Sequence, residues 1–277
     1  MVEIQVSSYE EFERKVEGIF SGIETTKKNN PFKVYSAPLF RGQGHSSWKL
    51  KSTLERTLER TERFLESSEF TYLHYLQIMR NVQKDIQREA GKKWDINQTF
   101  DDCPFPNSPY QEEYEFMAYL RHHRFPSPLL DWTFSMKVAS FFAFQNHSDE
   151  ENVAVYVYLE HIGRADAGWT GRANLETPGP DIKPDIRHKK QESNYMLSIA
   201  TIEGRKIICN IEDAIKNKIY IDKKLKKYLI PSRERKKVLE KLERSGINAF
   251  TLFQDEDSLI DEDSLMERLK KREFPEK

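Results

Sequence analysis

Hydrophobic and polar positions recur with two different periods along the chain, which predicts both helices and strands. Residues 2–6 alternate as a short strand does, and Ser8 followed by Glu11 is typical of a capping box that opens a helix. A run with helical periodicity covers residues 69–90 and stops at Gly91, the residue type favoured just beyond a helix C-terminus. Charges dominate the outer face of this run, which is typical of a solvated amphipathic helix.

The second half of the chain is predicted to supply the centre of a sheet. Residues 153–159 form a short run of β-branched and aromatic residues, which is typical of a central strand. The apolar segment 136–144 predicts a buried helix, and residues 247–253 predict the last strand. Ser108 is predicted to cap another helix, with Gln111 completing its capping box.

Together these patterns predict an α/β (α+β) fold in which residues 1–277 form one domain. We expect a mixed, twisted central sheet wrapped by helices. A helical insertion is expected over about residues 61–108, with its accessory helical segment around 61–91. A short terminal helix is expected at about 258–272. Trp132 is expected in the core because it lies among large apolar residues.

Composition narrows the classes of function. The chain is 38% hydrophobic and 32% charged with a net charge of -1, so no basic field favours generic nucleic-acid binding. Its two cysteines, Cys103 and Cys209, are too few for a disulfide framework or a thiolate metal site, which favours a reducing cytoplasm. No apolar stretch approaches the roughly 18 residues of a membrane span, so we expect no membrane association.

One candidate site lies in residues 39–48. An apolar run leads through Phe40 into Arg41, Gly42, Gln43 and Gly44, which predicts a strand that ends at Arg41 and delivers its guanidinium into a glycine-lined turn. Such a turn can bind a phosphate or carboxylate, because a guanidinium matches an oxyanion with two parallel hydrogen bonds. The alternative is a structural arginine paired with an internal carboxylate such as that of Asp131.

A second candidate site lies in residues 122–133. His122 lies at the C-terminal end of a predicted helix, where the dipole favours its protonated form, and is either a core or capping residue or a proton-transfer group. Asp131 lies between Leu130 and Trp132 and is either a structural cap or ion-pair partner or a site residue, and Thr133 competes for the same cap. We expect Arg41, His122 and Asp131 to converge on one cleft.

Several reaction classes lack their local signatures. The sequence contains no GxSxG, HExxH, GxxxxGK[ST] or GxGxxG motif, which argues against serine hydrolases, zincins, phosphate-loop enzymes and dinucleotide-binding Rossmann folds. His122 and His123 are adjacent rather than one helical turn apart, so they are poorly placed as a helical metal pair. We expect no metal.

Four ordered blocks resemble the FRG domain family, named after a Phe-Arg-Gly triplet. The first consists of Phe40, Arg41, Gly42, Gln43, Trp48, Leu50, Leu54 and Arg56. The second consists of His122, His123, Pro126 and residues 129–133. The third consists of Arg187, Gln191 and Tyr195, and the last of Ile230, Pro231, a helix up to Gly246 and residues 251–253. The departures are Arg124 and Ser193 at positions where the family usually has Gly, Ser127 for Thr and Pro128 for Arg.

The FRG resemblance implies a single FRG-type domain with core motifs over about residues 35–260, but it does not specify a reaction. A weaker resemblance concerns order: an arginine in an aromatic-Arg-Gly context, a later threonine and a late glutamine are similar to the Arg, Ser/Thr, Glu constellation of ADP-ribosyltransferases. It implies NAD as co-substrate, with Arg41 binding the diphosphate, Thr133 supporting the nicotinamide side and Gln191 in the late acidic position. Gln191 can hydrogen-bond a ribose hydroxyl but cannot act as a base, which suits a nucleic-acid acceptor or requires a carboxylate such as Asp131 or Glu192.

The candidate residues fall into two sets. The expected catalytic residues are Arg41, His122, Asp131, Thr133 and Gln191. The expected NAD contacts are Phe40, Arg41, Gly42, Gln43, Trp132 and Tyr195.

The sequence therefore favours an NAD-dependent ADP-ribosyltransferase-like toxin or antiphage defence effector in the cytoplasm. Its acceptor would be a protein or a nucleic acid, and a neutralising or regulatory protein is an expected partner. One alternative is a non-catalytic module that senses a ligand or binds a partner. The other is a metal-independent ribonuclease that uses His122 and Asp131 for proton transfer.

Overall fold

The computed structural model describes residues 1–60, 70–91, 94, 111–161, 174–176, 186–202, 205–209, 211 and 224–253. Its strands are β1 (Val2–Gln5), β2 (Leu39–Gln43), β3 (Leu130–Thr133), β4 (Asn152–Tyr158), β5 (Asn174–Glu176), β6 (Ser193–Ile202), β7 (Arg205–Ile208) and β8 (Leu225–Pro231). They form a sheet in the order β1-β8-β4-β2-β3-β6-β5, and β7 also pairs with β6. The β1 and β8 pair is parallel and the other pairs are antiparallel, so the predicted mixed sheet is confirmed.

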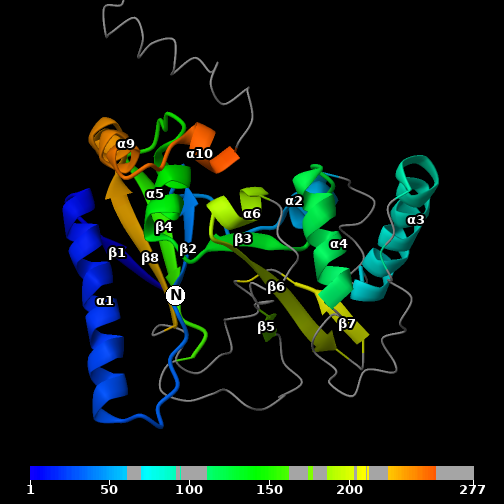
Figure 1. Cartoon of the computed structure of the whole chain (residues 1–277), viewed down its shortest axis with the longest axis horizontal. Helices are drawn as coiled ribbons and strands as arrows, with labels where there is room; N and C mark the ends of the chain where they lie inside the picture. The colour runs from blue at the N-terminus through cyan, green and yellow to red at the C-terminus, as the bar shows by residue number, and fades with distance from the viewer. Residues whose placement is uncertain are drawn as a thin grey trace, which may run out of the picture.

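Helices gather over two separate parts of this sheet. They are α1 (Tyr9–Asn29), α2 (Thr53–Arg60), α3 (Tyr72–Ala90), α4 (Gln111–His122), α5 (Met136–Phe144), α6 (Ile186–Lys190), the 3-10 helix Ser232–Glu234, α9 (Arg235–Arg244) and α10 (Ala249–Phe253). Figure 1 shows α1, α5 and α9 beside β8, β4 and β2, whereas α3 and α4 lie toward β6 and β7. No described helix combines the length and apolar character needed to cross a membrane.

The core has three clusters of buried side chains. Under α1, α5 and α9, the sheet contributes Phe40, Val155 and Tyr228. The opposite face of the same strands buries Leu39 and Tyr156 together with Trp132 of β3. A third cluster joins α3 and α4 to the odd-numbered positions of β6. The first two clusters lie on opposite faces of the sheet because successive side chains along a strand point to opposite sides. Trp132 is buried, so the predicted core position of this residue is confirmed.

Several local predictions are confirmed. Residues 136–144 form the buried helix α5, and β4 lies in the sheet between β8 and β2. The Ser8 hydroxyl accepts a hydrogen bond from the Glu11 amide at 3.2 Å and so caps α1. Gly91 ends α3 with a left-handed φ of 67°, a conformation that glycine adopts without steric strain.

The strand predicted over residues 247–253 is wrong, because residues 249–253 form the helix α10. The Asn248 side chain accepts from the Thr251 amide at 2.9 Å, and the Thr251 hydroxyl accepts from the Asn248 amide at 3.0 Å. This reciprocal capping favours a helical turn over the strand suggested by the apolar residues. The predicted cap at Ser108 and the terminal helix at 258–272 lie outside the described residues, as does part of the insertion at 61–108.

Candidate functional site

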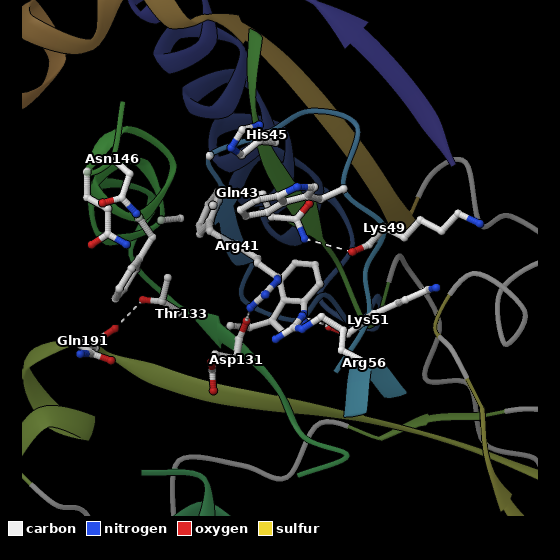
Figure 2. A pocket seen from close by; sticks show the side chains of 18 of the residues that line it. Arg41, Gln43, His45, Lys49, Lys51, Arg56, Asp131, Thr133, Asn146 and Gln191 are labelled. Carbon is white, nitrogen blue, oxygen red and sulfur yellow. Dashed lines mark hydrogen bonds between the residues drawn. The ribbon is translucent and has the colours of Figure 1, made fainter. Parts of the chain in front are cut away.

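A cavity of about 900 Å³ lies along β2 and β3. All five residues of β2 pair with β4, whereas the register joins β2 to β3 at Phe40 and Thr133. The cavity is lined by Phe40, Arg41, Gly42, Gln43, Gly44, His45, Ser47, Trp48, Lys49, Lys51, Arg56, Glu59, Asp131, Trp132, Thr133, Ala139, Phe142, Gln145, Asn146, His147, Gln191, Ser193 and Phe253. A ligand in this cavity would therefore contact both strands and the segment that follows β2 (Figure 2).

The strand predicted to end at Arg41 instead continues to Gln43, so Gly42 lies within β2 and the glycine-lined turn expected after Arg41 is corrected. The Arg41 Nη1 donates a hydrogen bond to the backbone oxygen of Asp131 at 2.6 Å, and Figure 2 shows the guanidinium extending toward that residue. The Arg41 Nε is enclosed and has no hydrogen-bond partner among the described residues. Burial lowers the pKa of Arg41 to about 10, which leaves the guanidinium charged at neutral pH.

The role of Gly42 also differs from the predicted turn. A Cβ at this position would overlap the Ala139 carbonyl oxygen of α5 and lie 2.7 Å from the Ala143 nitrogen. Gly42 therefore lets β2 pack directly against α5. Phe40, one residue earlier, is fully buried in the core and also contributes to the cavity wall.

Asp131 forms an ion pair that the sequence did not reveal. Both of its carboxylate oxygens accept from the Arg121 guanidinium of α4. Burial by itself would raise the pKa of Asp131, but the Arg121 charge outweighs that effect and holds the pKa below its usual value. The ion-pair role considered for Asp131 is therefore present, with Arg121 as the charged partner and Arg41 bonded to the backbone.

His122 and Tyr195 lie away from the cavity wall. The His122 Nε2 is 3.1 Å from the Tyr195 hydroxyl, and neither residue lines the cavity. Tyr195 is buried on β6 opposite Asp131. The expected convergence on one cleft thus holds for Arg41 and Asp131 but not for His122.

Thr133 and Gln191 lie together on the side of the cavity opposite Lys49 and Lys51 (Figure 2). The Thr133 hydroxyl donates to the Gln191 carbonyl oxygen at 2.6 Å and accepts from the Ser135 amide at 3.0 Å. The cap of α5 is Ser135 rather than Thr133, because the Ser135 hydroxyl accepts from the Val138 amide. The Gln191 side chain donates to the Leu252 carbonyl oxygen at 3.1 Å and so connects this wall to α10.

The segment after β2 contributes site residues that the sequence interpretation missed. Trp48 is 54% exposed, and its ring stacks on that of His45 with centroids 4.4 Å apart. Lys49, Lys51 and Arg56 add positive charge to the cavity wall. Lysines interleaved with a tryptophan are a visible sign of an anion or nucleotide surface, and this pattern was available in the sequence.

The cavity has more cations than free anions. Its two lining carboxylates are both ion-paired, Asp131 with Arg121 and Glu59 with Lys51. Among the lining residues, Arg41, Lys49 and Arg56 have no carboxylate ion pair within the described part of the chain. The wall therefore favours an anionic ligand. Among all the residues that the structure describes, no group of three or more His, Cys, Asp or Glu side chains could hold a metal ion.

Comparison with known proteins gives one result for this region. Residues 36–152 match the FRG domain. This FRG segment runs from just before β2 to the first residue of β4, so it includes Arg41, Gln43, Asp131, Trp132 and Thr133. The match supports the FRG resemblance of the first two sequence blocks, and Gln191 lies beyond it. No curated protein and no solved structure matches the chain.

Proposed function

We propose that this protein binds NAD in the β2–β3 cavity and transfers its ADP-ribose to a protein or nucleic-acid acceptor. The observation that carries the proposal is the enclosed Arg41 guanidinium, whose Nε has no partner among the described residues and lines the cavity. A buried donor without a partner is unfavourable by about 1 to 3 kcal/mol, and a ligand oxyanion would satisfy it.

The surrounding groups match the parts of NAD. The Arg56 charge acts on Arg41 and would help to hold a diphosphate, and Lys49 adds positive charge to the same cavity wall. The exposed Trp48 ring offers a face for a base. A volume of about 900 Å³ lies in the upper part of the range of about 300 to 1,000 Å³ typical of small-molecule pockets. A dinucleotide is a ligand of suitable size and charge for this cavity.

The chemistry would rest on charge and position. Cleavage of the nicotinamide glycosidic bond passes through a cationic, oxocarbenium-like sugar, which a nearby carboxylate stabilises. Asp131 is the available group, since its lowered pKa keeps it ionised at neutral pH and its side chain remains 48% exposed. Gln191 would accept hydrogen bonds from the ribose hydroxyls or donate to them, but it would not act as a base.

A non-catalytic ligand-sensing module is the second candidate, favoured by the ion pairs that hold both lining carboxylates. The ribonuclease alternative would need His122 and Asp131 to face one substrate, whereas His122 does not line the cavity. As a toxin or defence effector, the proposed transferase would require control by a neutralising or regulatory partner in the cytoplasm.

The test is incubation of the pure protein with labelled NAD and a cell lysate, following both nicotinamide release and transfer of label. Arg41→Ala should lower kcat/KM by about 30- to 1,000-fold, corresponding to the roughly 2 to 4 kcal/mol that such charge contacts contribute. Arg14→Ala on the exposed side of α1 is the matched control and should leave activity unchanged. NAD binding without consumption would support the sensing module, and absence of NAD binding would reject the transferase.

A further inference from the structure

Three enclosed polar atoms in the cavity wall have no hydrogen-bond partner among the described residues. They are the Nε of Arg41, the indole Nε1 of Trp132 and the Oε1 of Gln43. Gln43 is 6% exposed and Trp132 is 2% exposed, so neither side chain can rely on bulk water. All three residues line the cavity, and a ligand there would satisfy these atoms once the side chains turn toward it.

These atoms define a pattern of two donors and one acceptor. The Arg41 and Trp132 nitrogens donate, whereas the Gln43 oxygen can only accept. The Gln43 amide is oriented by its Nε2, which donates to the Lys49 carbonyl oxygen at 3.3 Å (Figure 2). That bond keeps Oε1 as the atom left for the ligand.

The strand geometry sets the spacing of the pattern. Arg41 and Gln43 are two positions apart on β2, so their side chains lie on the same face, separated by about 7 Å along the strand. Inorganic phosphate and pyrophosphate carry P–OH donors at neutral pH, but these belong to the same compact groups whose oxygens Arg41 and Trp132 would bind. They therefore place no donor that far along the strand, and the Gln43 oxygen stays unsatisfied. A phosphate ester with a hydroxyl or amino group at about that distance would satisfy both ends.

We infer that Gln43 is a specificity-determining residue that selects sugar phosphates and nucleotides over inorganic polyphosphates. Arg41 and Trp132 bind the anionic oxygens, and Gln43 accepts from a hydroxyl or amino group of the same ligand. The inference rests on the proposed function in that the ligand is a nucleotide, but it requires no catalysis.

The test compares the binding of ADP-ribose and pyrophosphate by calorimetry, since both contain a diphosphate and only ADP-ribose carries sugar hydroxyls. Gln43→Met should raise the Kd for ADP-ribose by about tenfold, because the hydrogen bond from a ligand hydroxyl to Gln43 is lost. The Kd for pyrophosphate should change by less than about twofold, because pyrophosphate does not make that bond. Trp132→Phe should raise both Kd values by a similar factor, because it removes a donor to the shared diphosphate.

Gln43→Leu repeats the first test with a different side chain, and Gln87→Met on the exposed face of α3 is the matched control. Thermal unfolding of each free variant identifies any that does not fold. The inference is overturned if the folded Gln43 variants lose affinity equally for both ligands or for neither. It is also overturned if the wild type does not bind ADP-ribose. If the predicted binding pattern is found but NAD is not consumed, the inference stands and the transferase proposal fails.

Discussion

Gly42 lies where β2 passes directly beneath α5, and its missing side chain is what permits this approach. The nearest atoms to an added Cβ belong to the backbone of Ala139 and Ala143, which cannot rotate away as the end of a side chain can. Small residues at both helix positions continue the same close packing, since Ala139 and Ala143 are fully buried. A single methyl group would therefore separate the helix from the strand that carries Arg41.

Gly42→Ala should lower the free energy of unfolding by about 1 to 3 kcal/mol or more, as over-packing of a tight core does. Chemical denaturation measures the change. The matched control is Gly18→Ala in α1, where a Cβ would meet nothing within 4 Å. That substitution should stabilise the helix by about 0.5 to 1 kcal/mol. A Gly42→Ala protein as stable as the wild type would show that α5 does not contact β2 in this way.

At the scale of elements, the C-terminus of α4 determines where Arg121 and His122 lie. The Phe125 amide donates to the Leu120 carbonyl oxygen and the Arg124 amide to the Arg121 carbonyl oxygen, each at 3.0 Å. These two bonds are typical of a helix C-terminus that ends in a left-handed residue, and the residue in that position is Arg124. Arg124 has a φ of 64°, at a position where the resembled family usually has glycine.

Arg124→Gly should raise the free energy of unfolding by about 0.5 to 1 kcal/mol, because glycine removes the steric strain of a left-handed L-residue. The Arg124 side chain is exposed, so its loss should have little other effect. Arg124→Ala keeps the Cβ and serves as the control, with no comparable gain expected. The two variants are compared by thermal and urea denaturation, and an equal response of both would contradict the strain explanation.

At the scale of the whole molecule, Glu150 joins the segment after β2 to the start of β4. Its carboxylate accepts from the Ser46 hydroxyl at 2.9 Å, from the Ser47 amide at 3.1 Å and from the Ser47 hydroxyl. The hydrogen bonds from Ser47 and Ser46 lower the pKa of Glu150 to about 2. Ser47 lines the cavity, so this carboxylate also positions part of the site.

The stabilisation by Glu150 should depend on pH. A folded-state pKa below the unfolded value means that the stabilisation is fully present above about pH 4.5 and is lost as the pH falls toward 2. The stability difference between the wild type and Glu150→Gln, measured by urea denaturation, should therefore be largest near pH 6 and disappear near pH 2. Glu151→Gln changes an exposed neighbour and should show no such trend. A Glu150→Gln deficit that is constant across this range would contradict the role of the carboxylate.

The sequence by itself determined the local elements. Periodicity and capping involve residues only a few positions apart. They were enough to predict the buried helix at 136–144, the central strand at 153–159, the start of α1 and the end of α3. Capping also explains the failure at 247–253, where the Asn248 and Thr251 pair outweighs the apolar pattern.

The tertiary structure decided the site. The sequence identified Arg41 and Asp131 as residues that could lie together, but the bond between them joins positions 90 apart in the chain. Strand order and register place Arg41 inside β2, bring Arg121 to Asp131, and direct His122 to Tyr195 instead of the cavity. Contacts at such separations depend on how whole elements pack, which local patterns do not specify.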